Sequence, residues 1–63
     1  MKIEFVHQRK VIHEVDSVSV PYVSEIVNMA KKGDSQQPYL VSNRIWHPIQ
    51  NKVEVFLMKM GEG

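Results

Sequence analysis

The chain has 63 residues, a net charge of +1 and no cysteine. This length has room for one small domain, residues 1–63, and the absence of cysteine excludes disulfides and thiolate metal sites. No apolar run approaches the ~20 residues that cross a bilayer, and the near balance of charge argues against a dedicated nucleic-acid binder.

The N-terminal segment alternates polar and apolar residues from Lys2 to Phe5, which predicts a strand. It contains no apolar export segment, so together with the lack of cysteine it predicts a cytoplasmic location. The polar step from His7 to Lys10 predicts a turn, and Val11–Val20 is rich in β-branched residues that suit a sheet. We therefore expect a β-hairpin from about residue 2 to residue 18.

The next segment, Pro21 to Lys32, fits two structures. Val23, Ile26, Val27 and Ala30 have the i, i+3, i+4, i+7 spacing of an amphipathic helix. Alternate residues from Val23 to Met29 also fit a strand, and a helix of about ten residues is marginal by itself. A short helix near residues 22–32 and a strand both stay open, and a polar loop ending at Pro38 follows.

Two further strands are predicted from Tyr39 to His47 and from Lys52 to Met58, joined by a short turn. The most apolar face of each strand is odd-numbered, and directly paired residues of a hairpin share a face. Odd residues should therefore pair with odd residues, which requires an odd number of loop residues. A three-residue loop predicts these pairs: Val41 with Leu57, Asn43 with Val55, Ile45 with Val53, and Arg44 with Glu54. A longer loop would instead pair Ile45 with Val55.

Four runs resemble parts of small bacterial and phage-encoded proteins with SH3-like β-barrels. The runs are Val20-Pro21-Tyr22-Val23-Ser24-Glu25-Ile26-Val27, Pro38-Tyr39-Leu40-Val41, Arg44-Ile45-Trp46-His47 and Val53-Glu54-Val55-Phe56-Leu57. Those proteins often carry V-P-x-x-G-[DE]-x-V, where this chain has Ser24 in place of the glycine. The resemblance implies a strand after Pro21. The predicted fold class is mainly β: a small SH3-like barrel or a curled antiparallel sheet of four or five strands, with the short helix near residues 22–32 as an open alternative.

The sequence contains no pattern typical of catalysis or cofactor binding. The histidines His7, His13 and His47 have no second ligand at a metal-binding spacing, and no serine lies in a nucleophile motif. Glu14 and Asp16 share a strand face, as paired carboxylates for acid–base catalysis would. A solvated sheet edge explains the same arrangement at least as well. We therefore expect no enzyme, no cofactor and no metal site.

The second face of the C-terminal hairpin is the candidate partner-binding surface, because tryptophan and arginine are enriched at the energetic centres of protein interfaces. The alternative is that its aromatic residues close the barrel core. The candidate residues are Leu40, Arg44, Trp46, Glu54, Phe56 and Met58.

The predicted function is a non-enzymatic binding module that acts by protein–protein contact. The resemblance suggests a phage or mobile-element accessory protein that modulates a host factor. One alternative is a nucleic-acid-binding small β-barrel, since aromatic and basic residues together also bind single strands. Another is a structural homo-oligomer subunit, because a core this small leaves only ~3–5 kcal/mol of net stability. The expected partners are accordingly an unidentified host protein or a second copy of the chain in a homodimer, with nucleic acid less favoured and no membrane.

Overall fold

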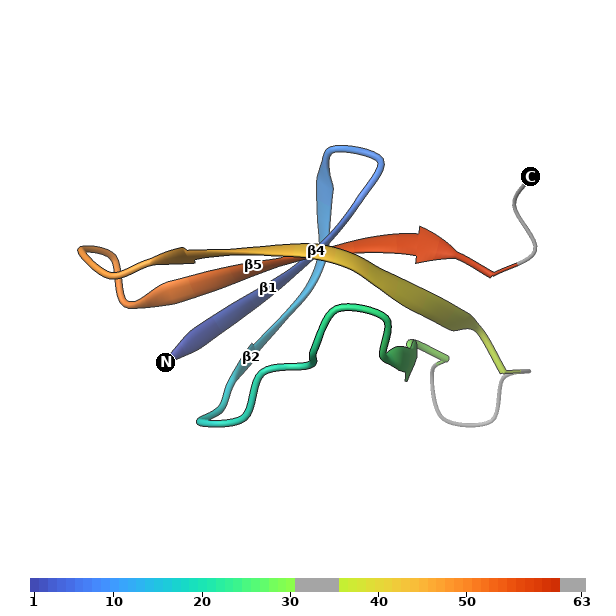
Figure 1. Cartoon of the computed structure of the whole chain (residues 1–63), viewed down its shortest axis with the longest axis horizontal. Helices are drawn as coiled ribbons and strands as arrows, with labels where there is room; N and C mark the ends of the chain where they lie inside the picture. The colour runs from blue at the N-terminus through green and yellow to red at the C-terminus, as the bar shows by residue number, and fades with distance from the viewer. Residues whose placement is uncertain (31–35, 61–63) are drawn as a thin grey trace.

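The computed structural model describes residues 1–30 and 36–60, which contain five β-strands and no helix. The strands are β1 (Lys2–His7), β2 (Lys10–Asp16), β3 (Ile26–Asn28), β4 (Pro38–His47) and β5 (Lys52–Lys59). They form one strongly twisted sheet in the order β2-β1-β5-β4-β3 (Figure 1). The mainly β, curled-sheet prediction is confirmed. In the described part of the chain, therefore, no helix is present that could cross a membrane.

The predicted N-terminal hairpin is present, although β2 ends at Asp16. Its turn consists of Gln8 and Arg9, which have φ values of 52° and 66°. Two successive residues with positive φ are typical of the two-residue turn whose twist matches that of paired strands. One extra residue, Ile12, interrupts the pairing of β2 with β1, because Phe5 pairs with His13 and Val6 with Val11.

The expectation of a wholly antiparallel sheet needs one correction. β1 and β5 are parallel neighbours, with Lys2 opposite Lys52 and Val6 opposite Phe56. Residues far apart in sequence therefore meet at the centre of the sheet, and the alternation within a single strand carries no information about such a neighbour.

The alternative of a short helix near residues 22–32 is wrong for residues 22–30; residues 31 and 32 lie outside the described part. Tyr22 to Glu25 form a tight turn instead, in which the Glu25 amide donates to the Tyr22 carbonyl over 3.0 Å. Ser24 then donates its amide to Val41 O over 2.8 Å, and Val41 donates to Glu25 O over 2.9 Å. Backbone pairing with β4 thus takes the place of a helix too short to be stable alone.

The predicted register of the C-terminal hairpin is right at one end and wrong at the other. Val41 pairs with Leu57 as expected, but Ile45 pairs with Glu54. Two features cause the difference. The loop has four residues, 48–51, because His47 pairs with Lys52, and an extra residue, Ser42, forms a bulge between Val41 and Asn43. The remaining mistaken predictions are corrected as follows: Asn43 pairs with Phe56, and Arg44 pairs with Val55. Trp46, for which no partner was predicted, pairs with Val53.

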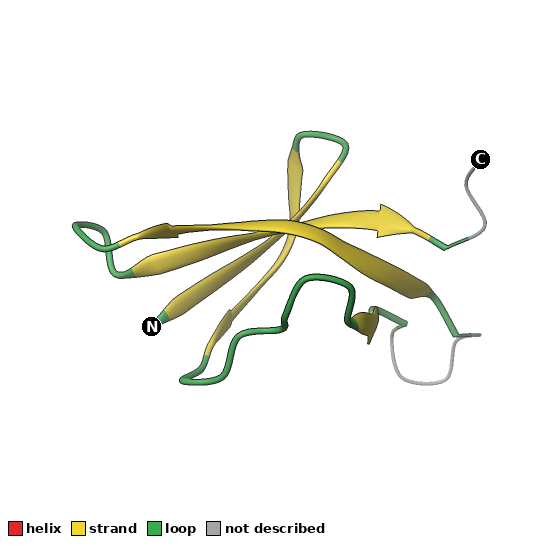
Figure 2. Cartoon of the chain, in the orientation of Figure 1, coloured by secondary structure: helices red, strands yellow, loops and turns green. Residues whose placement is uncertain are grey.

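The core lies on one face of the sheet, which we call the inner face. Its buried residues are Ile3, Phe5, Val41, Val53, Val55 and Leu57. Figure 2 shows the connection from β2 to β3 as a long loop with little regular structure. Val20 of this connection, Val27 of β3 and Met29, which follows β3, pack against the core, so this part of the chain covers the inner face in place of a second sheet.

Candidate functional site

The bulge at Ser42 divides the six predicted binding residues between the two faces of the sheet. Residues that pair directly across strands share a face. Leu40 pairs with Met58, Glu54 with Ile45, and Phe56 with Asn43. The four predicted residues on the outer face are therefore Leu40, Glu54, Phe56 and Met58. Arg44 and Trp46 pair with the core residues Val55 and Val53, so they lie on the inner face. The prediction of one shared surface is therefore wrong.

Trp46 lies on the core side of the sheet and is nevertheless 65 % exposed. It is near the C-terminal end of β4, one residue before His47. Beside it is a hollow of about 390 Å³, which we call the Trp46 pocket; it is lined by Met1, Val20, Arg44, Trp46, Asn51 and Val53. This volume is within the range of small-ligand and anchor-residue pockets, ~300–1,000 Å³.

Arg44 is held in place at this pocket by two contacts from the segment between β2 and β3, residues 17–25, which we call the connecting segment. Its Nη1 donates a hydrogen bond to the Pro21 carbonyl over 3.3 Å. Its guanidinium carbon lies 5.0 Å from the centre of the Tyr22 ring, within the range of a cation–π contact. Tyr22 is itself largely exposed. The side chain therefore has a defined position before any partner arrives.

The turn after Pro21 positions Tyr22 over the arginine. Ser24 has a φ of 74°, a value that the third position of such a turn requires and that glycine adopts without cost. This is the position at which the V-P-x-x-G pattern described in the sequence analysis has its glycine. The Glu25 carboxylate accepts a hydrogen bond from the Tyr22 amide over 2.9 Å, which closes the turn from the other side.

A polar hollow adjoins the Trp46 pocket and shares Met1 and Asn51 with it. Its other lining residues include Lys2, Glu14 and Asp16. The N-terminal ammonium of Met1 donates to Asp16 Oδ1 over 2.9 Å. A ligand in the two hollows would therefore meet an apolar floor at Trp46 and paired charges at the other end.

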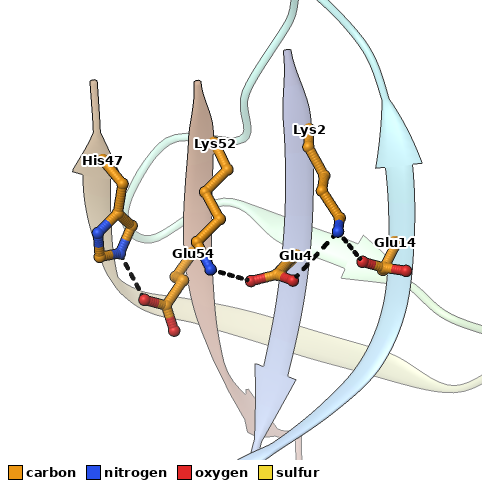
Figure 3. A network of polar contacts seen from close by, with 6 residues as sticks. All are labelled: Lys2, Glu4, Glu14, His47, Lys52 and Glu54. Carbon is orange, nitrogen blue, oxygen red and sulfur yellow. Dashed lines mark hydrogen bonds and ion pairs between the residues drawn. The ribbon is translucent and has the colours of Figure 1, made fainter. Parts of the chain in front are cut away.

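The outer face carries a network of charged residues across four strands (Figure 3). Lys2 Nζ lies 2.8 Å from Glu14 and 3.8 Å from Glu4, and Lys52 Nζ lies 3.1 Å from Glu4. The hydrogen bond to Glu14 and the negative charge of that residue raise the pKa of Lys2 above its ordinary value, with a smaller contribution from Glu4. Both lysines are therefore engaged within the protein.

Glu54 completes this network through the 2.5 Å contact of its Oε1 with His47 Nε2. Glu54, one of the predicted binding residues, is therefore already paired within its own sheet. The other two histidines lie against aromatic rings, His7 against Tyr39 and His13 against Phe5. Within residues 1–30 and 36–60, no three potential metal ligands come together.

Sequence reasoning missed four residues that line the pocket, Met1, Val20, Asn51 and Val53, and also Tyr22, which contacts Arg44 beside it. The Pro21-Tyr22 pair was the available sign for Tyr22, because proline at such a position predicts a turn that presents its neighbours to solvent. Met1 and Asn51 reach the pocket through the parallel β1–β5 pairing, for which the sequence has no local sign.

Comparison of the chain with protein-family models, curated proteins and solved structures finds no match. The resemblance to phage-encoded SH3-like barrels and the cytoplasmic location stay predictions, and the function is inferred from the geometry described above.

Proposed function

We propose that this protein is a non-enzymatic binding module that acts by protein–protein contact at the Trp46 pocket. The observation that carries the proposal is the exposure of Trp46 next to an arginine already fixed by Pro21 and Tyr22. Tryptophan, tyrosine and arginine are the residue types most enriched at binding hot spots.

The fixed position of Arg44 favours binding over a purely structural role. Ordering a long side chain on association costs about 0.5–1.5 kcal/mol, and a preordered arginine avoids much of that cost. An exposed indole loses its unfavourable contact with water when a partner covers it. The partner surface that fits is an apolar anchor side chain for the pocket, with a carboxylate or carbonyl group near Arg44.

The resemblance of residues 20–57 to phage-encoded barrels extends the proposal to the protein's biological role. In this view the module is a phage or mobile-element accessory protein, and its partner is a host protein whose activity it modulates.

A nucleic-acid-binding barrel is the second candidate, since Trp46 and Tyr22 beside Arg44 also suit base stacking. The charge distribution favours it less. Lys2, which lines the adjoining polar hollow, and Lys52 are each paired with glutamates, so they add little free positive charge around the pocket.

A capture experiment tests the proposal. Immobilised wild-type protein, Trp46→Ala and Arg44→Ala are each exposed to bacterial lysate at low and at high salt, with Ile49→Ala as the matched control. Ile49 is 96 % exposed in the β4–β5 loop and lines neither hollow described here. We expect one host protein to be retained at both salt concentrations by the wild type and the control, and to be lost from both pocket variants.

Two results would contradict protein–protein contact as the function. One is a partner that binds Trp46→Ala as well as it binds the wild type. The other is retention of a single-stranded oligonucleotide whose affinity falls steeply with salt and depends on Trp46, which would establish the second candidate instead.

A further inference from the structure

The outer face of the sheet is divided into a charged half and an apolar half. Pairing across the strands arranges its residues in rows. One row holds Asp16, Lys2, Lys52 and His47, and the next holds Glu14, Glu4, Glu54 and Ile45. The third row holds Val11, Val6, Phe56 and Asn43, and the fourth holds Met58, Leu40 and Ile26.

The third and fourth rows without Asn43 form what we call the outer apolar patch. Met58 is 47 % exposed and Ile26 is 58 % exposed, and Val11 is exposed to a similar degree. The connecting segment packs on the inner face, and Figure 1 shows it along one side of the sheet. Val6 is buried and Leu40 and Phe56 are half-buried, so the exposed part of the outer apolar patch consists of Val11, Ile26 and Met58.

The molecule also exposes more surface than a compact monomer of its size. Its accessible surface is 4817 Å², whereas a folded monomer of 7.3 kDa exposes about 4,160 Å². The excess of about 650 Å² is close to the ~800 Å² that each partner buries in a standard interface. The radius of gyration, 11.7 Å, likewise exceeds the ~10.6 Å expected for a compact domain of this length. The surplus, summed over the whole molecule, is thus somewhat smaller than one side of a standard interface.

We propose that a second copy of the chain covers the outer apolar patch, so that two sheets pack face to face. The symmetry axis runs across the strands, between the third and fourth rows. In this arrangement Phe56 of each copy faces Met58 of the other, which makes the patch complementary to itself. The charged rows of the two copies lie at opposite ends of the dimer and stay in water.

The charge pattern selects this arrangement over the other one. An axis parallel to the strands would place each row against the same row of the second copy. Glu4, Glu14 and Glu54 would then face three further glutamates in a desolvated interface, where like charges are strongly unfavourable. Each of these glutamates has a lysine or histidine partner within its own copy. An interface that displaced those partners would leave the carboxylates without them.

The oligomeric state tests the proposal. Light scattering of the wild-type protein at about 100 µM should give twice the 7.3 kDa chain mass, since interfaces of this size commonly bind in the micromolar range. Met58→Lys and Ile26→Lys should each give the monomer mass, because the new charge would be buried in the dimer but lies at an exposed position in the free chain. Ile49→Lys adds the same charge outside the patch and should stay dimeric.

Circular dichroism of Met58→Lys and Ile26→Lys distinguishes loss of the dimer from loss of the fold, and both should retain the β spectrum of the wild type. A wild type that is monomeric at 100 µM, or two folded patch variants that remain dimeric, would overturn the proposal. Failure of this proposal and failure of the binding function are distinguishable, because Trp46→Ala lies on the inner face and should leave the dimer mass unchanged.

Discussion

The two halves of β4 differ sharply although they belong to one continuous strand, Pro38–His47. Before the bulge at Ser42, the strand pairs with β5 on one edge and with β3 and Ser24–Glu25 on the other, and Val41 is completely buried. After it, β5 is the only strand neighbour in the described part of the chain, and Trp46 is exposed although it faces the core side. The first half maintains the fold, and the second half presents the candidate site.

The comparison shows that the neighbours of a residue, more than its hydrophobicity, decide whether it stabilises the fold. The small Val41 is completely buried in the core, whereas the large Trp46 is 65 % exposed although it faces the same side of the sheet. The predictions that follow test this difference, beginning with the substitution that should cost the most.

Val41→Ala and Trp46→Ala measure the contrast directly. Truncating the buried valine should cost about 2–3 kcal/mol of unfolding free energy, most of what a domain of this size has. Truncating the exposed tryptophan should cost less than about 1 kcal/mol, although it removes more atoms. Urea unfolding followed by circular dichroism compares the two. A larger loss for Trp46→Ala would show that the second half of β4 is part of the core after all.

Ser42 itself is the boundary between the halves, and its hydroxyl donates a hydrogen bond to the Phe56 carbonyl over 3.2 Å. This bond supplies a partner at the point where the bulge interrupts the ladder. Ser42→Ala should therefore lose about 1 kcal/mol of stability, while Ser42→Thr should retain most of it. Equal stability of the two variants would show that the hydroxyl makes no contribution at the bulge.

The turn at Ser24 tests how the first half of β4 is supported at its second edge. Because Ser24 has a φ of 74°, replacing it with glycine should stabilise the protein by about 0.5–1 kcal/mol. Val23→Gly, which changes the neighbouring residue of the same turn, should destabilise it through the greater entropy of the unfolded chain. Thermal unfolding of both variants measures the effect, and a lower midpoint for Ser24→Gly would contradict the role assigned to this turn.

The smallest effect is expected from the charged network beside the second half of β4. The folded protein raises the pKa of Lys2, so the protonated lysine stabilises the fold below its ordinary pKa. This contribution to the free energy of unfolding should disappear as the pH rises through the raised pKa of Lys2. Glu14→Gln should make this loss of stability at alkaline pH smaller. Unfolding curves between about pH 9 and pH 12 measure it. An identical pH profile for Glu14→Gln would show that the pair does not influence stability.

Alternation and turn residues were enough to predict both hairpins, because these features depend on neighbours within about twenty residues. The segment from Val23 to Ala30 was ambiguous because valine and isoleucine there fit two periods at once. Its pairing with Val41 decided between them, and such a tertiary contact has no local signature. The parallel pairing of β1 with β5 is hidden from single-strand patterns for the same reason.

The residue types of the candidate site were predicted, but the face of the sheet on which they lie was not. Arg44 and Trp46 were identified by residue type, and their separation by two positions correctly predicted a shared face. The error came from Ser42 and the four-residue loop, which together change the register of half a strand. Nothing about a serine between Val41 and Asn43 distinguishes a bulge from a regular strand position, so the face that the pair occupies required the structure.

The parallel contact of β1 with β5 has a consequence for how the protein responds to mechanical force. β1 is the first strand and β5 the last, and their five paired positions run in the same direction. Tension applied through the two ends of the chain would pull β1 and β5 past each other along their length. The hydrogen bonds between them would then be loaded together, whereas a terminal hairpin would open one bond at a time. We therefore expect this small sheet to resist stretching more strongly than its modest thermodynamic stability suggests, with the β1–β5 ladder as the element that breaks first.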